Sequence, residues 1–256
     1  MPRVCLAFLI VCVLTFAASA AETEPDERRS GTFFMSRDLR EMQTDPASNP
    51  GMLWVKEGER LWYSDQSGRS CFDCHGEAKV SMTGVATRYP AFNSQTGQPM
   101  TLEQRINRCL TDHQNTTPLA YESKELLALT AFVATQSRGL AIEAGIDKRL
   151  DPFVAAGRAL FNLRQGQLNL SCAQCHQENW DKRLGGNAIT QAHPTGYPLY
   201  RLEWQGLGSL GRRLRNCLFG IRARLYDYGA PELVALEVYL MWRARGMGLE
   251  TPAIRP

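Results

Sequence analysis

Two copies of one five-residue pattern constrain this chain more than any other feature. The pattern Cys-x-x-Cys-His stands at residues 71–75 and again at residues 172–176. Two thiols about one helical turn apart can add to both vinyl groups on one edge of a porphyrin, and the histidine that follows can ligate the iron from the same side. The pattern therefore predicts two covalently bound haem c groups. Their attachment residues would be Cys71, Cys74, Cys172 and Cys175, and their histidine ligands His75 and His176.

A zinc site built from both cysteine pairs is the main alternative, because four thiolates suit zinc. It would leave both histidines unexplained and would have to close across about a hundred residues of chain. A redox-active Cys-x-x-Cys gives no reason for the histidine either. Haem attachment accounts for all three residue types in both copies.

The N-terminus predicts export. An apolar run from Val4 to Phe16 follows Arg3 and ends in small residues, which is typical of a signal peptide of residues 1–20 cleaved near Ala20. A membrane anchor is the alternative, but the run is shorter than the ~20 residues that span a bilayer, and we expect no membrane span after cleavage. The mature chain would then be soluble and, in a Gram-negative bacterium, periplasmic. A net charge of +3 from 29 basic and 26 acidic residues is too balanced for a nucleic-acid binder.

The similarity between the two halves extends beyond the haem motifs. Arg105 precedes Cys109 by four residues, as Arg213 precedes Cys217, and a Tyr-Pro pair stands twenty residues before each of these cysteines. We therefore predict an all-α fold of two tandem cytochrome c-like domains, related by duplication, with long loops that wrap the haems. The expected parts are an N-terminal arm (21–50) that begins as a solvated segment, a first domain (51–140) and a second domain (151–250).

The second iron ligand is sought among residues that both halves share. Met82, Met100, His113 and His193 have no equivalent in the other half. Met241 and Met247 lie in or after the closing helix of the second half, which is late for a distal ligand. Cys109 and Cys217 are both unassigned and equivalent, so we predict Cys109 as a ligand of the first iron and Cys217 as a ligand of the second. A Cys109–Cys217 disulfide, or two buried free thiols, are the alternatives.

Arg213 shares a helical face with Cys217 if residues 209–218 form a helix, because the two are four residues apart. A guanidinium there would favour a thiolate and could hold an oxyanion through paired hydrogen bonds. A thiolate beside a cationic group suits chemistry on sulfur anions. Arg105 holds the same position in the first half, where pairing with a haem propionate is an alternative use.

Two Cys-x-x-Cys-His domains, each followed by Arg-x-x-x-Cys, with an unpaired N-terminal arm, resemble the SoxA family of dihaem subunits of SoxAX complexes in sulfur-oxidising bacteria. The resemblance implies an L-cysteine S-thiosulfotransferase that joins thiosulfate to a cysteine of the carrier protein SoxYZ and passes electrons to a c-type cytochrome. It implies a SoxX cytochrome c subunit as partner. Cys217 would carry a persulfide as ligand of the second haem, and Arg213 would bind substrate.

Two other functions are compatible with the haem motifs. One is a dihaem electron-transfer cytochrome that makes no bonds itself. The other is a thiosulfate dehydrogenase, which couples two thiosulfates to tetrathionate. Neither explains why both halves keep the additional cysteine.

Overall fold

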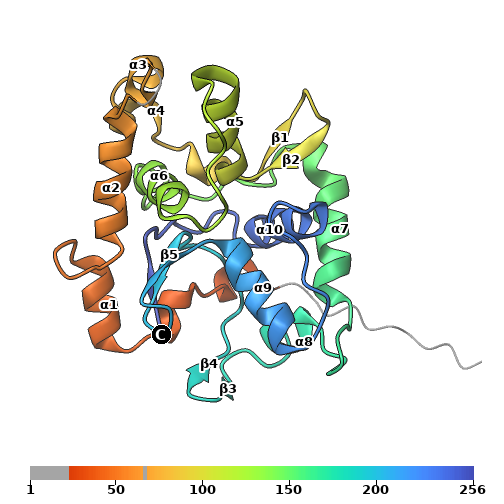
Figure 1. The fold of residues 1–256 in the computed structure, drawn as a ribbon. Coiled ribbons are helices and arrows are strands. Elements are labelled where there is room, and N and C mark those ends of the chain that lie inside the picture. Colours follow the sequence, from red (N-terminus) through yellow and green to blue (C-terminus); the bar gives the residue numbers. More distant parts are fainter. Residues whose placement is uncertain (1–22, 66–67) are drawn as a thin grey trace, which may run out of the picture.

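The computed structural model describes residues 23–65 and 68–256, and its framework is helical (Figure 1). The α-helices are α1 (Arg37–Thr44), α2 (Met52–Tyr63), α3 (Cys71–His75), α4 (Ala78–Ser81), α5 (Leu102–Gln114), α6 (Lys124–Thr135), α7 (Asp151–Asn162), α8 (Cys172–His176), α9 (Leu210–Gly220) and α10 (Pro231–Arg243). Short 3-10 turns are η1 (Pro25–Glu27), η2 (Gly31–Phe34), η3 (Ala86–Arg88) and η4 (Lys148–Leu150). The predicted signal peptide lies outside the described residues. No helix of the described part has the length and apolarity needed to cross a membrane.

The all-α prediction holds for the framework but misses short strands within the described residues. These are β1 (Ala91–Asn93), β2 (Gln98–Met100), β3 (Arg183–Leu184), β4 (Asn187–Ala188), β5 (Leu199–Arg201), β6 (Gly206–Gly208) and β7 (Ile254–Arg255). Three hairpins pair β1 with β2, β3 with β4 and β5 with β6, all antiparallel, and β7 adds to β5 in parallel. Strands of two or three residues are too short to leave an alternating pattern in the sequence.

Two long helix pairs, one in each half, give the fold its shape. Helix α2 packs against α6, and α7 packs against α10. Each crossing has a glycine at its centre: a Cβ on Gly58 would lie 2.1 Å from the carbonyl oxygen of Ala128, and one on Gly157 would lie 2.0 Å from that of Ala235. A side chain at either position would push the helices apart. The glycines therefore set how closely each pair approaches.

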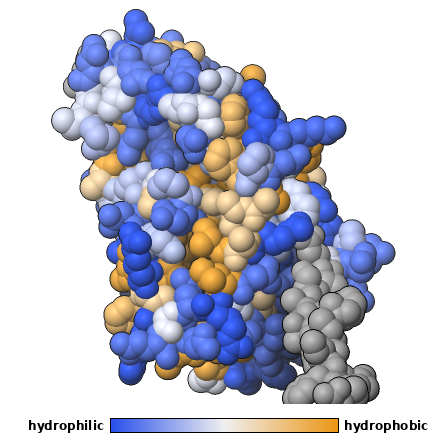
Figure 2. Space-filling model, turned by 90° about the vertical axis from the view of Figure 1, so that its right-hand side faces the viewer, coloured by the Kyte–Doolittle hydropathy of each residue, from blue (hydrophilic) through white to orange (hydrophobic). Residues whose placement is uncertain are grey.

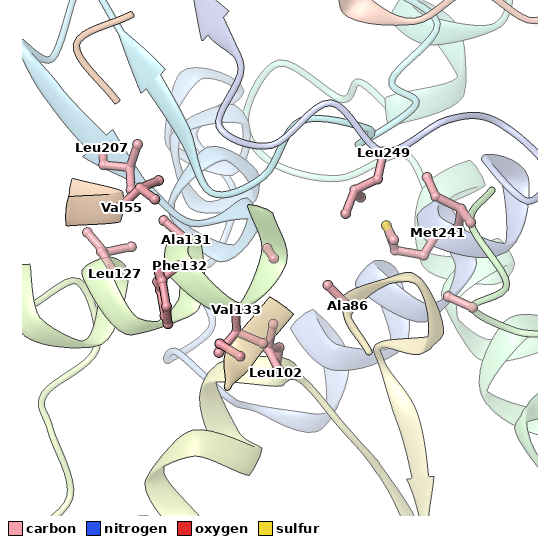
Figure 3. Close-up of a cluster of buried hydrophobic side chains, with 14 of the residues drawn as sticks. Val55, Ala86, Leu102, Leu127, Ala131, Phe132, Val133, Leu207, Met241 and Leu249 are labelled. Atoms are coloured by element: carbon pink, nitrogen blue, oxygen red, sulfur yellow. The ribbon is translucent and has the colours of Figure 1, made fainter. Parts of the chain in front are cut away.

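One apolar core contains residues from both halves (Figure 3). Val55, Leu127 and Phe132 come from the first half, and Leu207 and Met241 come from the second. A second core forms around α7 and α10. Because side chains of the two halves share a core, the halves pack as one body.

The N-terminal segment is exposed over residues 24–27, in line with its charges, but from Arg28 on it contacts the second half. The Arg28 guanidinium donates hydrogen bonds to the carbonyl oxygens of Arg243 (3.0 Å) and Arg245 (2.6 Å), and the backbone N–H of Arg29 donates to Gln191 Oε1 (2.6 Å). Arg243 ends α10, where the last carbonyls of a helix have no partner inside it. The segment thus caps a helix of the second half.

The C-terminus is tied to the same arm. Gln43 of α1 is buried, and its Oε1 accepts hydrogen bonds from the backbone N–H of Ile254 (3.0 Å) and from the Arg255 guanidinium (2.8 Å). Figure 1 shows the C-terminus beside α1. The first and last described segments therefore close over the same side of the molecule.

The side of the molecule that carries α7 has apolar surface among hydrophilic residues (Figure 2). A surface cavity of about 560 Å³ lies between the β1 segment and the linker that joins the two halves, residues 141–150 before α7. Phe92, Ile146 and Arg149 are among its lining residues. The linker therefore packs against the first half.

Candidate haem and thiolate sites

The two Cys-x-x-Cys-His segments form short helices, α3 and α8, that begin in the same way. Ser70 and Ser171 are the N-caps; each hydroxyl accepts a hydrogen bond from the backbone N–H three residues later, at 3.2 Å in both helices. The side-chain oxygens of Asp73 and Gln174 in turn accept hydrogen bonds from the backbone N–H of the N-cap residues, at 2.7 and 2.9 Å. Such a reciprocal cap satisfies two free donors and stabilises one helical turn. Each pair of cysteines is thereby held one turn apart, as thioether attachment requires.

The histidine of α8 is oriented by the backbone. Nδ1 of His176 lies 2.6 Å from the carbonyl oxygen of Thr190, so this nitrogen carries the proton and Nε2 remains available to a metal. Burial, reinforced by the charges of Arg213 and Arg243, lowers the pKa of His176 to about 4. A neutral imidazole with a fixed tautomer is the form that ligates iron.

The histidine of α3 has a different environment. Its ring lies 5.7 Å from the ring of Trp62. Burial, with a smaller contribution from the Arg105 charge, lowers the pKa of His75 as well. Both predicted histidine ligands therefore favour the neutral form, although in the described part of the chain only the His176 ring has a backbone hydrogen-bond partner.

The additional cysteines lie on helices that face the attachment cysteines. Cys217, on α9, lies close enough to Cys172 and Cys175 to raise the pKa of both thiols. Burial is the larger cause for both, and the pKa of Cys172 is raised to about 12. Cys109, on α5, lies close enough to Cys71 to raise the pKa of that thiol in the same way. Burial is the main cause that raises the pKa of Cys109 itself. All six described cysteines are free. The Cys109–Cys217 disulfide is thus not formed, and each cysteine faces the haem motif of its own half.

These donor sets fit covalently bound haem better than zinc. Each half brings together two thiols on one helical turn, an imidazole at the end of that turn and one further thiol on a separate helix. Among the described residues, no group of three or more His, Cys, Asp or Glu side chains is arranged to hold a metal ion by itself. Residues Cys71, Cys74, His75 and Cys109 would hold one haem, and Cys172, Cys175, His176 and Cys217 the other.

Arg213 lies one turn before Cys217 on α9, as predicted. Burial lowers its pKa, but the nearby Cys217 and Tyr197 outweigh burial, and the pKa is raised overall. No hydrogen bond or ion pair ties its guanidinium within residues 23–65 and 68–256. A half-buried guanidinium beside a cysteine sulfur is therefore available to an anion. Arg105 of the first half is exposed instead.

The structure adds two side chains that the sequence did not single out for the site. Tyr197 is close to Arg213 and Cys217, and burial raises its pKa to about 12. Arg201 is 6% exposed, forms a 3.1 Å ion pair with Glu203 and lies close enough to Arg213 and Cys217 to interact with their charges. The repeated Tyr-Pro pair was a signal for Tyr197, while nothing in the sequence pattern indicated Arg201.

Other candidates for the second iron ligand have different contacts. His193 is buried, and its Nδ1 lies 3.0 Å from the carbonyl oxygen of Arg29. Met241 is part of the shared apolar core, and Met82 packs against it. Each of these side chains therefore has a hydrogen-bonding or packing partner within the fold.

The helical framework and the two Cys-x-x-Cys-His helices define a c-type cytochrome. Comparison with known proteins narrows the class. The family described as SoxA/TsdA, cytochrome c domain, matches residues 57–142. An L-cysteine S-thiosulfotransferase subunit SoxA from Pseudaminobacter salicylatoxidans is 35% identical over 93% of this chain and 85% of its own length. The protein of the same name from Rhodovulum sulfidophilum is 34% identical over 90% and 81%. This chain belongs to the SoxA family.

A solved structure supports the same assignment. The crystal structure of SoxXA from P. pantotrophus matches with a TM-score of 0.86 and 29% identity, over 90% of this chain and 87% of that one. The similarity covers both helix pairs, because it extends over nearly the whole chain. The cytochrome c-like fold therefore holds beyond the segment that the family description matches.

Proposed function

We propose that this chain is the catalytic dihaem subunit of an L-cysteine S-thiosulfotransferase. The observation that carries the proposal is the pairing of Cys217 with the untied Arg213 on α9, facing the haem motif of α8. Membership of the SoxA family, whose curated relatives carry the name L-cysteine S-thiosulfotransferase subunit, supports it. The reaction joins thiosulfate to a cysteine of a carrier protein.

Two covalently bound haem c groups are part of the proposal. When bound, they supply one-electron redox centres that can remove the electrons released by the reaction. His75 and Cys109 would ligate one iron, and His176 and Cys217 the other. The haem at Cys217 would be the active-site haem.

The protein side chains would bind and orient the substrates. Thiosulfate is a dianion whose sulfonate oxygens can accept paired hydrogen bonds from the Arg213 guanidinium. This contact directs the terminal sulfur toward Cys217, which we propose carries a persulfide. In the net reaction the carrier thiol loses its proton, an S–S bond forms between the carrier sulfur and the terminal sulfur of thiosulfate, and two electrons leave.

The partners and compartment follow from the same proposal. The similar crystal structure is that of SoxXA, so we propose a SoxX-type cytochrome c subunit as partner of this chain. A SoxYZ-type protein would be the carrier and a c-type cytochrome the electron acceptor. An exported chain, cleaved near Ala20, would do this in the periplasm.

We also propose that the two halves, residues 51–140 and 151–250, arose by tandem duplication. Matching helix crossings at Gly58 and Gly157 support this. So does a small cavity of about 60 Å³ at the junction, because Tyr89 and Tyr197, which are equivalent in the two halves, both line it.

The test uses the complete complex with its carrier. Thiosulfate and an oxidised c-type cytochrome are added, and the carrier is weighed by mass spectrometry. Cys217→Ala should abolish the thiosulfate-dependent mass gain, whereas Cys109→Ala should retain it if the first haem is intact. Transfer that survives Cys217→Ala contradicts the mechanism. Tetrathionate release without carrier modification would instead identify a thiosulfate dehydrogenase.

A further inference from the structure

The N-terminus of the active-site helix α9 is contacted by a loop of the first half. The carboxyl of Glu122 lies close to the hydroxyl and backbone N–H of Ser209, the N-cap of α9; both groups lower its pKa, although burial, the larger cause, raises the pKa overall. Oε2 of Glu122 is buried, accepts no hydrogen bond from the described residues and lies 3.9 Å from Nη1 of the Arg212 guanidinium. A carboxylate at this position interacts favourably with the positive end of the helix.

The loop that carries Glu122 fits closely onto the second half. The ring of Tyr121 stacks on Tyr228, with centroids 5.7 Å apart and planes at 17°. Gly229 lies so near that a Cβ there would be 2.4 Å from the Tyr121 hydroxyl oxygen. Glu122 itself has a φ of 63°, in the left-handed region that costs a non-glycine residue free energy. The contacts with the second half offset this cost.

The contact with Arg212 affects the proposed reacting residues, because Arg212 and Arg213 are neighbours on α9. Their side chains point about 100° apart around the helix axis, so the direction of one sets the direction of the other. Arg212 is held on two sides, by Glu122 and by the ring of Trp204, whose centroid lies 4.2 Å from the guanidinium carbon. Together with the burial of Leu214 and Leu218 in the second core, these contacts of Arg212 favour one rotation of α9 about its axis. The direction of Arg213 and Cys217, on the same helix, is fixed with it.

Other acidic groups surround the same helix start. Glu237 of α10 and Glu103 of α5 interact with each other and with Glu122, and a Cβ on Gly211 would lie 3.4 Å from Glu237 Oε1. Of the three carboxyls, only Glu122 forms an ion pair with an arginine of α9 among the described residues. It is therefore the carboxyl whose removal would loosen the orientation of α9 most directly.

We propose that Glu122 is a positioning residue, through which the first cytochrome half holds the active-site helix α9 in the orientation that directs Arg213 and Cys217 at thiosulfate. The inference rests on the proposed function for its catalytic consequence. It also gives the first half a task that does not depend on its haem carrying electrons.

The experiment compares Glu122→Ala and Glu122→Gln with Glu125→Gln. Glu125 is an exposed carboxylate three residues away, so its replacement removes the same charge without touching α9. The first readout is electron paramagnetic resonance of the oxidised holoprotein, on the haem signal that Cys217→Ala alters. The second is kcat/KM for thiosulfate-dependent modification of the carrier.

We expect Glu122→Ala to shift or broaden the haem signal of the second half, leave that of the first half unchanged and lower kcat/KM about tenfold. Glu122→Gln keeps an oxygen that can accept from Ser209 and should give an intermediate effect. It also serves as the folded variant if the alanine protein is unstable. Glu125→Gln should match the wild type in both readouts.

A double-mutant cycle with Ser209→Ala separates positioning from general stability. If Glu122 acts through the start of α9, the two substitutions together should lower kcat/KM by less than the product of their separate effects. Glu122 variants that match Glu125→Gln in signal and kcat/KM overturn the inference. If the wild type does not modify the carrier, the proposed function fails, and the resonance signal still decides whether Glu122 positions α9.

Discussion

Replacing Arg213 by glutamine removes the one guanidinium that lies on α9 beside Cys217 in the described structure without a hydrogen bond or ion pair of its own. If the guanidinium makes two charge-assisted hydrogen bonds to the sulfonate of thiosulfate, each contributes about 1.5 kcal/mol or more. The sum of about 3 kcal/mol corresponds to a loss of about a hundredfold in kcat/KM. Arg213→Lys keeps the charge but loses the planar fork, so its loss should be smaller, about tenfold.

The assay is the initial rate of carrier modification as thiosulfate is varied, with haem content measured in each preparation. Arg224→Gln is the matched control, since Arg224 is an exposed arginine that follows α9 and whose guanidinium carbon lies 5.5 Å from the centre of the Tyr226 ring. It should remain within about twofold of the wild type. Arg213→Gln with full haem content and kcat/KM within the same twofold would refute the assignment of Arg213 as the substrate-binding group.

Three further predictions concern the helix crossing, the buried acids and Cys217. Gly157→Ala should lower the melting temperature of the holoprotein by about 5 °C, because the alanine Cβ would meet the α10 backbone. Gly220 has open space around it, so Gly220→Ala should leave the melting temperature unchanged. Equal melting temperatures for the two variants would contradict the packing argument. Burial and mutual repulsion raise the pKa values of Glu103 and Glu237, whose neighbours include Glu122 and Tyr121. The folded protein therefore binds protons at these carboxyls more tightly than the unfolded chain. The free energy of unfolding should fall as the pH rises from the unfolded carboxyl pKa through the folded pKa. Glu237→Gln should flatten this fall in melting curves recorded from pH 5 to 8, and an unchanged slope would count against it. Intact-protein mass spectrometry of active protein should find one extra sulfur on Cys217, and its absence would argue against a persulfide.

The haem motifs were predictable because their geometry is local. Cys71, Cys74 and His75 lie within one helical turn, so their spacing alone brings them to one edge of a porphyrin. Arg213 and Cys217 are likewise one turn apart on α9, and the structure keeps them together. Such pairs depend on helix periodicity and not on the packing of distant segments.

The strands and the docking of the N-terminal segment were not predictable in this way. Two-residue strands such as β7 exist because β5 lies beside them, and a charged segment such as the one at Arg28 reads as solvated until the end of α10 is known. Arg201 stands twelve residues before Arg213 with no periodic relation to it. Its closeness to Cys217 depends on the β5–β6 hairpin.

The sequence by itself determined the cysteine and histidine pattern, the pairing of arginine with cysteine in each half and the family. Those features depend on spacings of three or four residues, which a helix converts directly into distance. The tertiary structure alone decided that Tyr197 and Arg201 lie near Cys217 and that Glu122, in the other half, lies at the start of α9. Contacts between segments so far apart in sequence form only when the two halves bury a common core, and no local pattern records which side chains that burial brings together.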